Sequence, residues 1–369
     1  MIGKLILSDG TVFLGQNFGA NLTASGEVVF NTGMVGYPES LTDPSYFGQI
    51  LVLTYPLAGN YGIPKKEFWE SKKIQVTALI VQNYIEHPSH FESENTLTEW
   101  LKEQGIPALH GIDTRALTTK LRQHGVMLGK IECKVPARGE ARQRRQSATL
   151  PAGRQECKVN KTYDPNKENI LPLVSTNKVE IYGSGRKNII LIDCGTKENI
   201  VKSLVKRGVK VTRVPWNFDP LAQGLDFDAV LVSNGPGDPK QAKETIQTVK
   251  QIFTKNIPTF GICLGCQIMA LAAGGNTFKL KFGHRGQNQP VMNIDTGKAL
   301  ITSQNHGFAV DTKSLGAEWQ EWFFNLNDKT NEGIKHKTKP FMAVQFHPEA
   351  SPGPVDAGYL FDEFIKLLK

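Results

Sequence analysis

From residue 188 onward, short apolar runs alternate with segments of helical periodicity. They follow the order strand 188–193, helix 197–207, strand 209–214, strand 228–233, helix 239–253 and strand 258–262. Strands that alternate with helices favour a parallel sheet covered by helices on both faces. We therefore predict a doubly wound, mostly parallel, flavodoxin-like α/β domain over residues 187–369. Functional sites in such sheets form at the carboxyl ends of the strands.

The first half of the chain is β-rich. Apolar runs at 4–7 and 11–15 flank Ser8-Asp9-Gly10, and an Asp-Gly pair favours a tight hairpin. Further patterns predict strands at 27–31 and 49–54 and helices at 97–104 and 114–124, the second helix with Asp113 as its N-cap. We predict a separate β-rich α/β domain over residues 1–182, followed by a linker at 181–186.

The segment 133–160 differs from both domains. It carries seven basic and two acidic side chains, a net charge of +5 out of +8 for the whole chain, and few large apolar residues. Such a stretch cannot bury enough apolar area to offset its ordering entropy. We expect a disordered surface insertion, and the alternative is an arm that binds an anionic partner.

Composition excludes several classes of protein. With 40% hydrophobic and 21% charged residues, the 369-residue chain is not wholly disordered. No apolar run reaches the roughly 18 residues of a membrane span, and the first residues do not resemble a signal peptide. Five scattered cysteines do not suggest a disulfide framework. We expect a reduced, cytoplasmic protein that binds neither membrane nor nucleic acid.

The strongest chemical motif is Gly261-Ile262-Cys263-Leu264-Gly265, where an apolar strand runs into a helical pattern. Flanking glycines allow a tight strand-to-helix turn that projects one side chain, as in a nucleophile elbow. The helix N-terminus favours a thiolate, and its free N–H groups can bind an oxyanion. Cys263 is therefore the predicted nucleophile. The spacing Cys263-x-x-Cys266 leaves a redox pair open, but Cys266 is expected to pack as a small residue. Without a second Cys pair, we predict no metal site.

A cysteine nucleophile needs a base, and His347-Pro348-Glu349 follows the apolar strand 341–344. Residues i and i+2 of an extended chain point to the same side. Glu349 is therefore predicted to orient the His347 imidazole toward Cys263. A third strand ends in Ser233-Asn234-Gly235-Pro236-Gly237, where glycines let the backbone approach a ligand.

Together these motifs resemble the class I (triad) glutamine amidotransferases. The whole chain outside 133–160 resembles, more narrowly, the small subunits of carbamoyl-phosphate synthase. The narrower resemblance rests on the stretches at 31–37, 41–46, 112–115, 281–286, 304–308 and 349–354. One departure is Cys266, a position that is often His in relatives.

The resemblance implies a glutaminase. Cys263 would form a γ-glutamyl thioester and release ammonia, His347 and Glu349 would complete the triad, and the N–H groups of Gly235 and Leu264 would hold the oxyanion. By the same analogy, glutamine would contact Ser45, Gly235, Gly237, Leu264, Gln267, Asn305, Gly307 and Phe308.

The resemblance also implies a partner. Ammonia would pass to a large subunit, in a heterodimer or a higher oligomer, that makes carbamoyl phosphate for arginine and pyrimidine synthesis. ATP and Mg²⁺ would bind that subunit, in agreement with the lack of a P-loop motif in this sequence. No cofactor is expected in this chain.

Three alternatives remain open from the sequence. One is a free-standing γ-glutamyl or cysteine hydrolase that needs no partner. The second is a regulatory or ammonia-channel subunit with an inactive site. The third is a nucleic-acid binder, which rests only on the Arg-rich segment.

Overall fold

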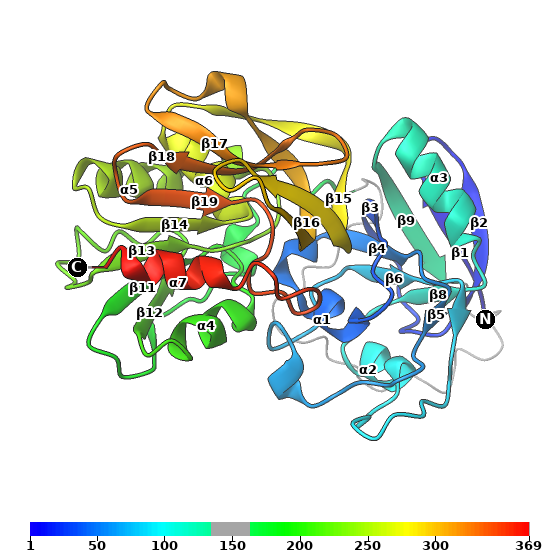
Figure 1. Ribbon diagram of the computed structural model, residues 1–369. Coiled ribbons are helices and arrows are strands. Elements are labelled where there is room, and N and C mark those ends of the chain that lie inside the picture. The colour runs from blue at the N-terminus through cyan, green and yellow to red at the C-terminus, as the bar shows by residue number, and fades with distance from the viewer. Residues whose placement is uncertain (134–162, 369) are drawn as a thin grey trace. The chain divides into compact units, whose positions relative to one another are not determined.

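The computed structural model describes residues 1–133 and 163–368, which form two compact units (Figure 1). Unit 1 holds residues 1–32 and 48–68 and the described residues of 72–164; unit 2 holds 33–47, 69–71 and the chain from 165 onward. Segments 33–47 and 69–71 precede the expected boundary at 182–187, yet they lie in unit 2. The predicted insertion, apart from Cys133, lies outside the described residues.

Unit 1 is built on a closed barrel with the strand order β1-β2-β8-β6-β4-β3-β9. The predicted hairpin joins β1 to β2, and Gly10 has a φ of +85° at its turn. Asp113 caps α3 as predicted, since its Oδ1 accepts from the N–H of Ala116 at 2.8 Å. The elements are β1 (Ile2–Leu7), β2 (Val12–Asn17), β3 (Ala24–Asn31), β4 (Gln49–Leu53), β6 (Ala78–Ile80), β8 (Ala108–His110), β9 (Met127–Cys133), α2 (Leu97–Glu103) and α3 (Thr114–His124), with β5 (Leu57–Ala58) and β7 (Asn83–Tyr84) as a separate pair.

Unit 2 contains a ten-stranded sheet of order β10-β12-β11-β13-β14-β19-β18-β17-β15-β16. Strands β12, β11, β13, β14 and β19 are parallel to one another, as the alternating pattern predicts. The elements are α1 (Tyr37–Thr42), β10 (Glu180–Tyr182), β11 (Asn188–Asp193), α4 (Glu198–Val205), β12 (Lys210–Pro215), β13 (Ala229–Val232), α5 (Lys243–Thr254), β14 (Thr259–Ile262), α6 (Leu264–Ala272), β15 (Asn276–Asn293), β16 (Ala299–Asp311), β17 (Trp319–Asn325), β18 (Asn331–His336), β19 (Phe341–Val344) and α7 (Tyr359–Lys366).

Helices cover both faces of the parallel strands (Figure 1). Alternate residues of β11 and β13 enter opposite layers: Ile190 and Val230 pack with α5 and α6, whereas Ile189 and Leu231 pack with α4 and α7. Strands buried on both faces read as continuous apolar runs, which is why the sequence pattern identified them.

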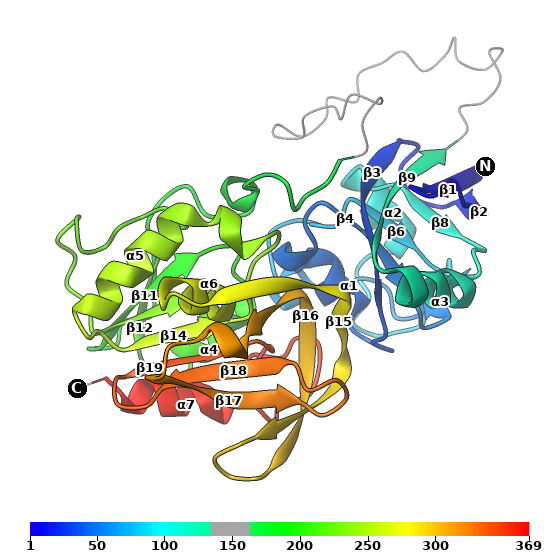
Figure 2. The same cartoon turned by 90° about the horizontal axis from the view of Figure 1, so that it is seen from above.

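The sheet differs from the expectation at both edges. Beyond β19 it continues through β18, β17, β15 and β16, all of them antiparallel to their neighbours, so the sheet is mixed (Figure 2). At the other edge, part of the predicted linker forms β10, which pairs antiparallel with β12. The helix predicted at 239–253 begins with a 3₁₀ turn at Pro239–Gln241, and α5 starts at Lys243.

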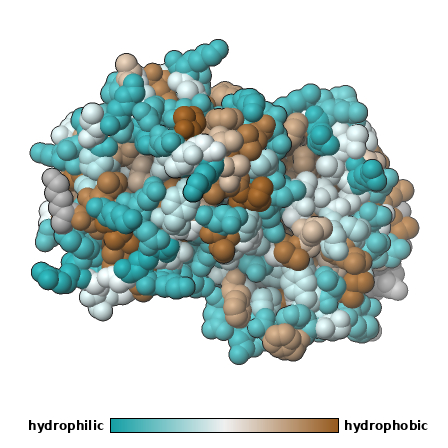
Figure 3. Space-filling view, viewed as in Figure 1, coloured by the Kyte–Doolittle hydropathy of each residue, from teal (hydrophilic) through white to brown (hydrophobic). Residues whose placement is uncertain are grey.

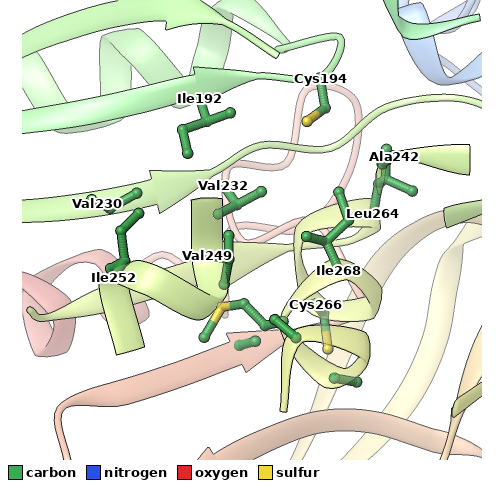
Figure 4. Packing of buried hydrophobic residues seen from close by; sticks show 14 of the residues in the cluster. Ile192, Cys194, Val230, Val232, Ala242, Val249, Ile252, Leu264, Cys266 and Ile268 are labelled. Atoms are coloured by element: carbon green, nitrogen blue, oxygen red, sulfur yellow. The ribbon is translucent and has the colours of Figure 1, made fainter. Parts of the chain in front are cut away.

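The turn from β14 into α6 depends on two glycines. A Cβ on Gly261 would lie 2.7 Å from the backbone of Gly265, and a Cβ on Gly265 would lie 2.1 Å from the carbonyl oxygen of Val232. Both are far inside van der Waals contact, so α6 can lie this close to β13 and β14 only with glycine at these positions. Figure 4 shows the packing that results, with Leu264, Cys266 and Ile268 of α6 among the side chains of the buried cluster.

No helix in the described residues is both long and apolar enough to cross a bilayer. On the face seen in Figure 3, hydrophobic side chains lie among hydrophilic ones.

We predict that Gly265→Ala lowers the free energy of unfolding by about 1–3 kcal/mol, because the new methyl group must displace α6 from β13. A thermal melt of the purified chain measures the effect. Gly316→Ala is the matched control, since its Cβ would meet only the carboxylate end of Glu318. Equal melting temperatures for the two variants would contradict the prediction.

Candidate active site

Cys263 stands at the junction of β14 and α6, in the strained turn that the sequence predicts. Its φ of 54° and ψ of −105° are unusual for a residue with a side chain, and such strain collects at functional sites. The thiol is 2% exposed. It directly precedes the first turn of α6, whose N–H groups have no partners within the helix and favour negative charge.

The predicted base is brought to the same sheet edge. Because β14 and β19 are parallel neighbours, with Ile262 opposite Val344, the residues that follow them lie side by side. The N–H of Cys263 donates to the carbonyl of Val344 at 2.8 Å. The N–H of His347 donates to the carbonyl of Ser303 at 2.9 Å, which fixes the segment after β19 against β16.

His347 and Glu349 form a tight buried pair. Nδ1 of His347 lies 2.6 Å from Oε1 of Glu349, as predicted from their spacing of two residues. Nε2 of His347 is buried and makes no hydrogen bond within the described residues. It interacts electrostatically with Cys263, so the ring stands between carboxylate and thiol.

The charges of this pair reinforce each other. Burial by itself lowers the pKa of His347, but Glu349 and Cys263 outweigh burial and raise it to about 10. Burial by itself raises the pKa of Glu349, but the positive charges of Lys197 and His347 outweigh burial and lower this pKa to about 2. Imidazolium and carboxylate therefore coexist at neutral pH.

A buried lysine, Lys197, contacts the Glu349 carboxylate and stabilises its negative charge. Lys197 is 2% exposed, and its Nζ lies 3.1 Å from Oε1 of Glu349 and donates to the carbonyl of Ala350. Burial lowers the pKa of Lys197, but its carboxylate neighbours raise it above the usual range. Glu70 is one of those neighbours; burial raises its own pKa to about 7. Glu70 accepts from the N–H of Asn199 at 3.1 Å and from the hydroxyl of Ser351.

Amide side chains surround the thiol. Cys263 Sγ lies 3.7 Å from the carbonyl of Asn305 and 3.7 Å from Nε2 of Gln345. Gln267, one turn into α6, donates from Nε2 to Oε1 of Gln345 at 3.0 Å and to the carbonyl of Phe308 at 2.9 Å. Asn305 thus contacts the Cys263 thiol directly, whereas Gln267 is linked to it through Gln345, and Phe308 through Gln267.

Ser45 enters unit 2 with segment 33–47. Its hydroxyl accepts from Nδ2 of Asn234 at 2.9 Å, directly after β13. Asp43 accepts from the N–H of Ser45 at 2.9 Å and from Nδ2 of Asn305 at 2.8 Å. Asp43 therefore links Ser45 to the strand that carries Asn305.

The predicted oxyanion residues are neighbours as well. A Cβ on Gly235 would lie 2.1 Å from the carbonyl oxygen of Cys194 and 2.8 Å from a methyl carbon of Leu264, so only glycine fits there. Gly237, with a φ of +86°, packs against Ile170. Gly307 stands beside the guanidinium of Arg285.

Sequence reasoning missed five polar residues of the site, for a clear reason. Asp43, Glu70, Lys197, Asn234 and Gln345 are far apart along the chain. Asp43 and Asn234 lie within the stretches 41–46 and 233–237, but the sequence pattern assigns neither of them a role. Four of them flank predicted strands or motif residues, which was the available signal. For Glu70, 127 positions before Lys197, the sequence offers none.

Comparison with known proteins assigns the family. The model described as carbamoyl-phosphate synthase small chain, CPSase domain, matches residues 5–131, and that described as glutamine amidotransferase class-I matches residues 190–367. The carbamoyl phosphate synthase small chain of Pyrococcus furiosus is 43% identical over 380 residues, covering 100% of this chain and 98% of that protein. The chain belongs to the carbamoyl-phosphate synthase small-chain family.

Other members of this family differ in length. The arginine-specific small chain of Phaeosphaeria nodorum is 44% identical over 98% of this chain and 74% of its own length. The multifunctional protein pyrABCN of Emericella nidulans is 45% identical over 99% of this chain, but the match covers 17% of that protein. The chain thus spans about a sixth of this multifunctional relative.

We predict that the contribution of His347 to stability depends on pH. A histidine whose pKa rises from 6.5 to about 10 on folding stabilises the protein fully below pH 6.5 and loses that effect as the pH approaches 10. The difference in melting temperature between the unmodified protein and His347→Asn should therefore shrink as the pH rises from 7 to about 10. A pH series of thermal melts tests this, with His124→Asn on the exposed end of α3 as control. A constant difference would show that His347 is not charged in the folded chain.

Proposed function

We propose that this chain is the glutaminase subunit of a carbamoyl-phosphate synthase. The observation that carries the proposal is the ionised His347–Glu349 pair beside the Cys263 thiol at the N-terminus of α6. Membership of the small-chain family supports the same assignment. Cys263 is the nucleophile, His347 the acid and base, and Glu349 the residue that orients and charges His347.

The reaction proceeds through a thioester. Cys263 Sγ attacks the carboxamide carbon of glutamine, and the N–H groups of Gly235 and Leu264 stabilise the negative oxygen that forms. Protonated His347 gives its proton to the leaving nitrogen, and ammonia departs. His347 then takes a proton from water as the water oxygen attacks the γ-glutamyl thioester. The C–S bond breaks, glutamate is released, and Cys263 is restored as a thiolate beside protonated His347.

Glutamine is held by residues on three sheet-edge segments. Ser45, Gly235 and Gly237 lie after β13 or beside it; Leu264 and Gln267 are in the first turn of α6; Asn305, Gly307 and Phe308 are on β16. The contacts of Gln267 with the Phe308 carbonyl and of Asn305 with Asp43 keep these segments in register.

The ammonia is used by another subunit. We propose a large-subunit partner that binds ATP and Mg²⁺ and converts ammonia and bicarbonate to carbamoyl phosphate for arginine or pyrimidine synthesis. The described cysteines, Cys133, Cys194, Cys263 and Cys266, are unpaired, and the nucleophile must stay reduced, so a cytoplasmic setting suits the reaction.

Replacing the nucleophile tests the chemistry. Cys263→Ser should lower glutamine hydrolysis by at least about 10³-fold, because a neutral hydroxyl is a far weaker nucleophile than a thiolate. Ammonia release from glutamine, measured on the purified chain with a large subunit, reports the rate. Cys266→Ala is the matched control and should keep most of the activity. Loss of activity in the control alone would reverse the assignment of the two cysteines.

Coupling to the partner needs a separate measurement. With a large subunit, ATP and bicarbonate, Cys263→Ser should fail to make carbamoyl phosphate from glutamine but should make it from added ammonium chloride at the rate of the unmodified complex. The free-standing hydrolase predicts instead full glutamine turnover without the partner and no dependence of that turnover on ATP.

A further inference from the structure

A second polar cluster is buried in unit 2, within the antiparallel part of the sheet. His284 on β15 and His306 on β16 are register partners across an antiparallel pair, and their rings meet edge to face at 4.9 Å. Glu332 on β18 lies beside both rings. Figure 2 shows β15 and β16 side by side, and β18 belongs to the same sheet with β17 between it and β15. All three side chains are buried, and one ligand atom of each lies within 4.8 Å of the others.

Each of the two histidines has one ring nitrogen bound to an acceptor outside the cluster. Nε2 of His284 lies 2.8 Å from Oδ2 of Asp328, and Nδ1 of His306 lies 2.8 Å from the carbonyl oxygen of Phe308. Both acceptors require a hydrogen on the nitrogen that faces them. Nε2 of His306 then carries a lone pair directed at Glu332. Burial lowers the pKa of His284, but Asp328 and Glu332 outweigh burial and raise it to about 9, so in the metal-free chain its Nδ1 carries a proton toward Glu332, which a metal ion would displace. Metal-binding histidines are held in this way by a carboxylate or a backbone carbonyl.

The centre of the cluster is rich in acceptors. Oε1 of Glu332 lies 3.0 Å from Nδ1 of His284 and 3.7 Å from Nε2 of His306, and Oε2 has no partner within the described residues. Oε1 of Gln304 lies 3.2 Å from Nε2 of His306. One side-chain amide donor also faces this centre: Nδ2 of Asn325 lies 3.3 Å from Oε1 of Glu332 and 3.4 Å from Nδ1 of His284.

The spacing matches the needs of a small divalent cation. Around a tetrahedral zinc ion, ligand atoms lie about 3.4 Å from one another, which follows from metal–ligand distances near 2.1 Å. The observed separations of 3.0 and 3.7 Å bracket this value. Two imidazole nitrogens and a carboxylate form a donor set that borderline metals such as Zn²⁺ and Co²⁺ prefer.

We propose that His284, His306 and Glu332 bind one divalent transition-metal ion of the Zn²⁺ class. Gln304 is within reach of a fourth position through Oε1. The ion would connect β15, β16 and β18, and β16 also carries Asn305, Gly307 and Phe308. The site is thus a structural one behind the glutamine-binding strand, and it exists whether or not the chain is a glutaminase.

No motif in the sequence indicates this site. Its three ligands are separated by 22 and 26 residues, with none of the short Cys or His spacings that mark zinc motifs. The prediction of no metal site follows from the lack of a second Cys pair, a criterion that does not consider His and Glu ligands.

Metal content and cobalt spectroscopy test the proposal. The 369-residue chain is stripped with a chelator and dialysed against buffered Zn²⁺ or Co²⁺. It is then analysed by elemental mass spectrometry and by the visible absorption of bound Co²⁺. The unmodified protein and the control His124→Asn should each bind one ion per chain. His306→Asn and Glu332→Gln should bind none. Asp328→Asn should bind about 10- to 100-fold more weakly, because it loses the carboxylate that orients His284.

Two outcomes would overturn the site. One is an unmodified chain that binds no ion at saturating metal, a result that does not depend on whether any variant folds. The other is binding that persists in both ligand variants and disappears in Cys263→Ser, which would place the metal at the reactive thiol. Glutamine hydrolysis is not a readout here, so this test and that of the proposed function can fail independently.

Discussion

The buried contact between Lys197 and Glu349 is the interaction on which the candidate active site depends. Neither charge could stay buried alone, and removing one partner of such a pair costs about 3–5 kcal/mol. Because Glu349 is negatively charged, it raises the pKa of His347, and the protonated ring can act as an acid beside Cys263. The contact also ties the segment after β11 to the segment after β19, so one ion pair sets both the charge and the position of the base.

The second constraint is steric. Gly261, Gly265 and Gly235 leave no room for a Cβ, and this brings α6 within contact of β13 and β14. The close approach places Gly235 beside the side chain of Leu264, and Cys263 between β14 and α6 adopts a positive φ of 54°. The glycines therefore contribute by allowing close backbone packing, whereas Lys197 and Glu349 contribute through the attraction between their charges.

The antiparallel extension of the sheet gives β16 two roles. Two backbone carbonyls of the strand face the thiol: the carbonyl of Asn305 lies 3.7 Å from Cys263 Sγ, and that of Phe308 accepts from Gln267. The side chain of His306 enters the cluster with His284 and Glu332, opposite to the side chain of Asn305, which donates to Asp43. Alternation along a strand makes this possible, since successive side chains face opposite sides. Any change in that cluster is one residue away from a predicted glutamine contact.

The parallel half of the sheet, the hairpin of β1 and β2, the Asp113 cap and the pairing of His347 with Glu349 could all be predicted from the sequence. Each depends on local chemistry: continuous apolar runs, an Asp-Gly turn, a capping carboxylate and an i, i+2 spacing in extended chain. The closed barrel, the antiparallel strands β15 to β18 and the placement of segment 33–47 in unit 2 could not, because they depend on pairings between distant segments. The same holds for Glu70, Lys197 and the His284–His306–Glu332 cluster. Burial and charge compensation act between residues that only the folded chain brings together, and for that reason tertiary structure alone decided them.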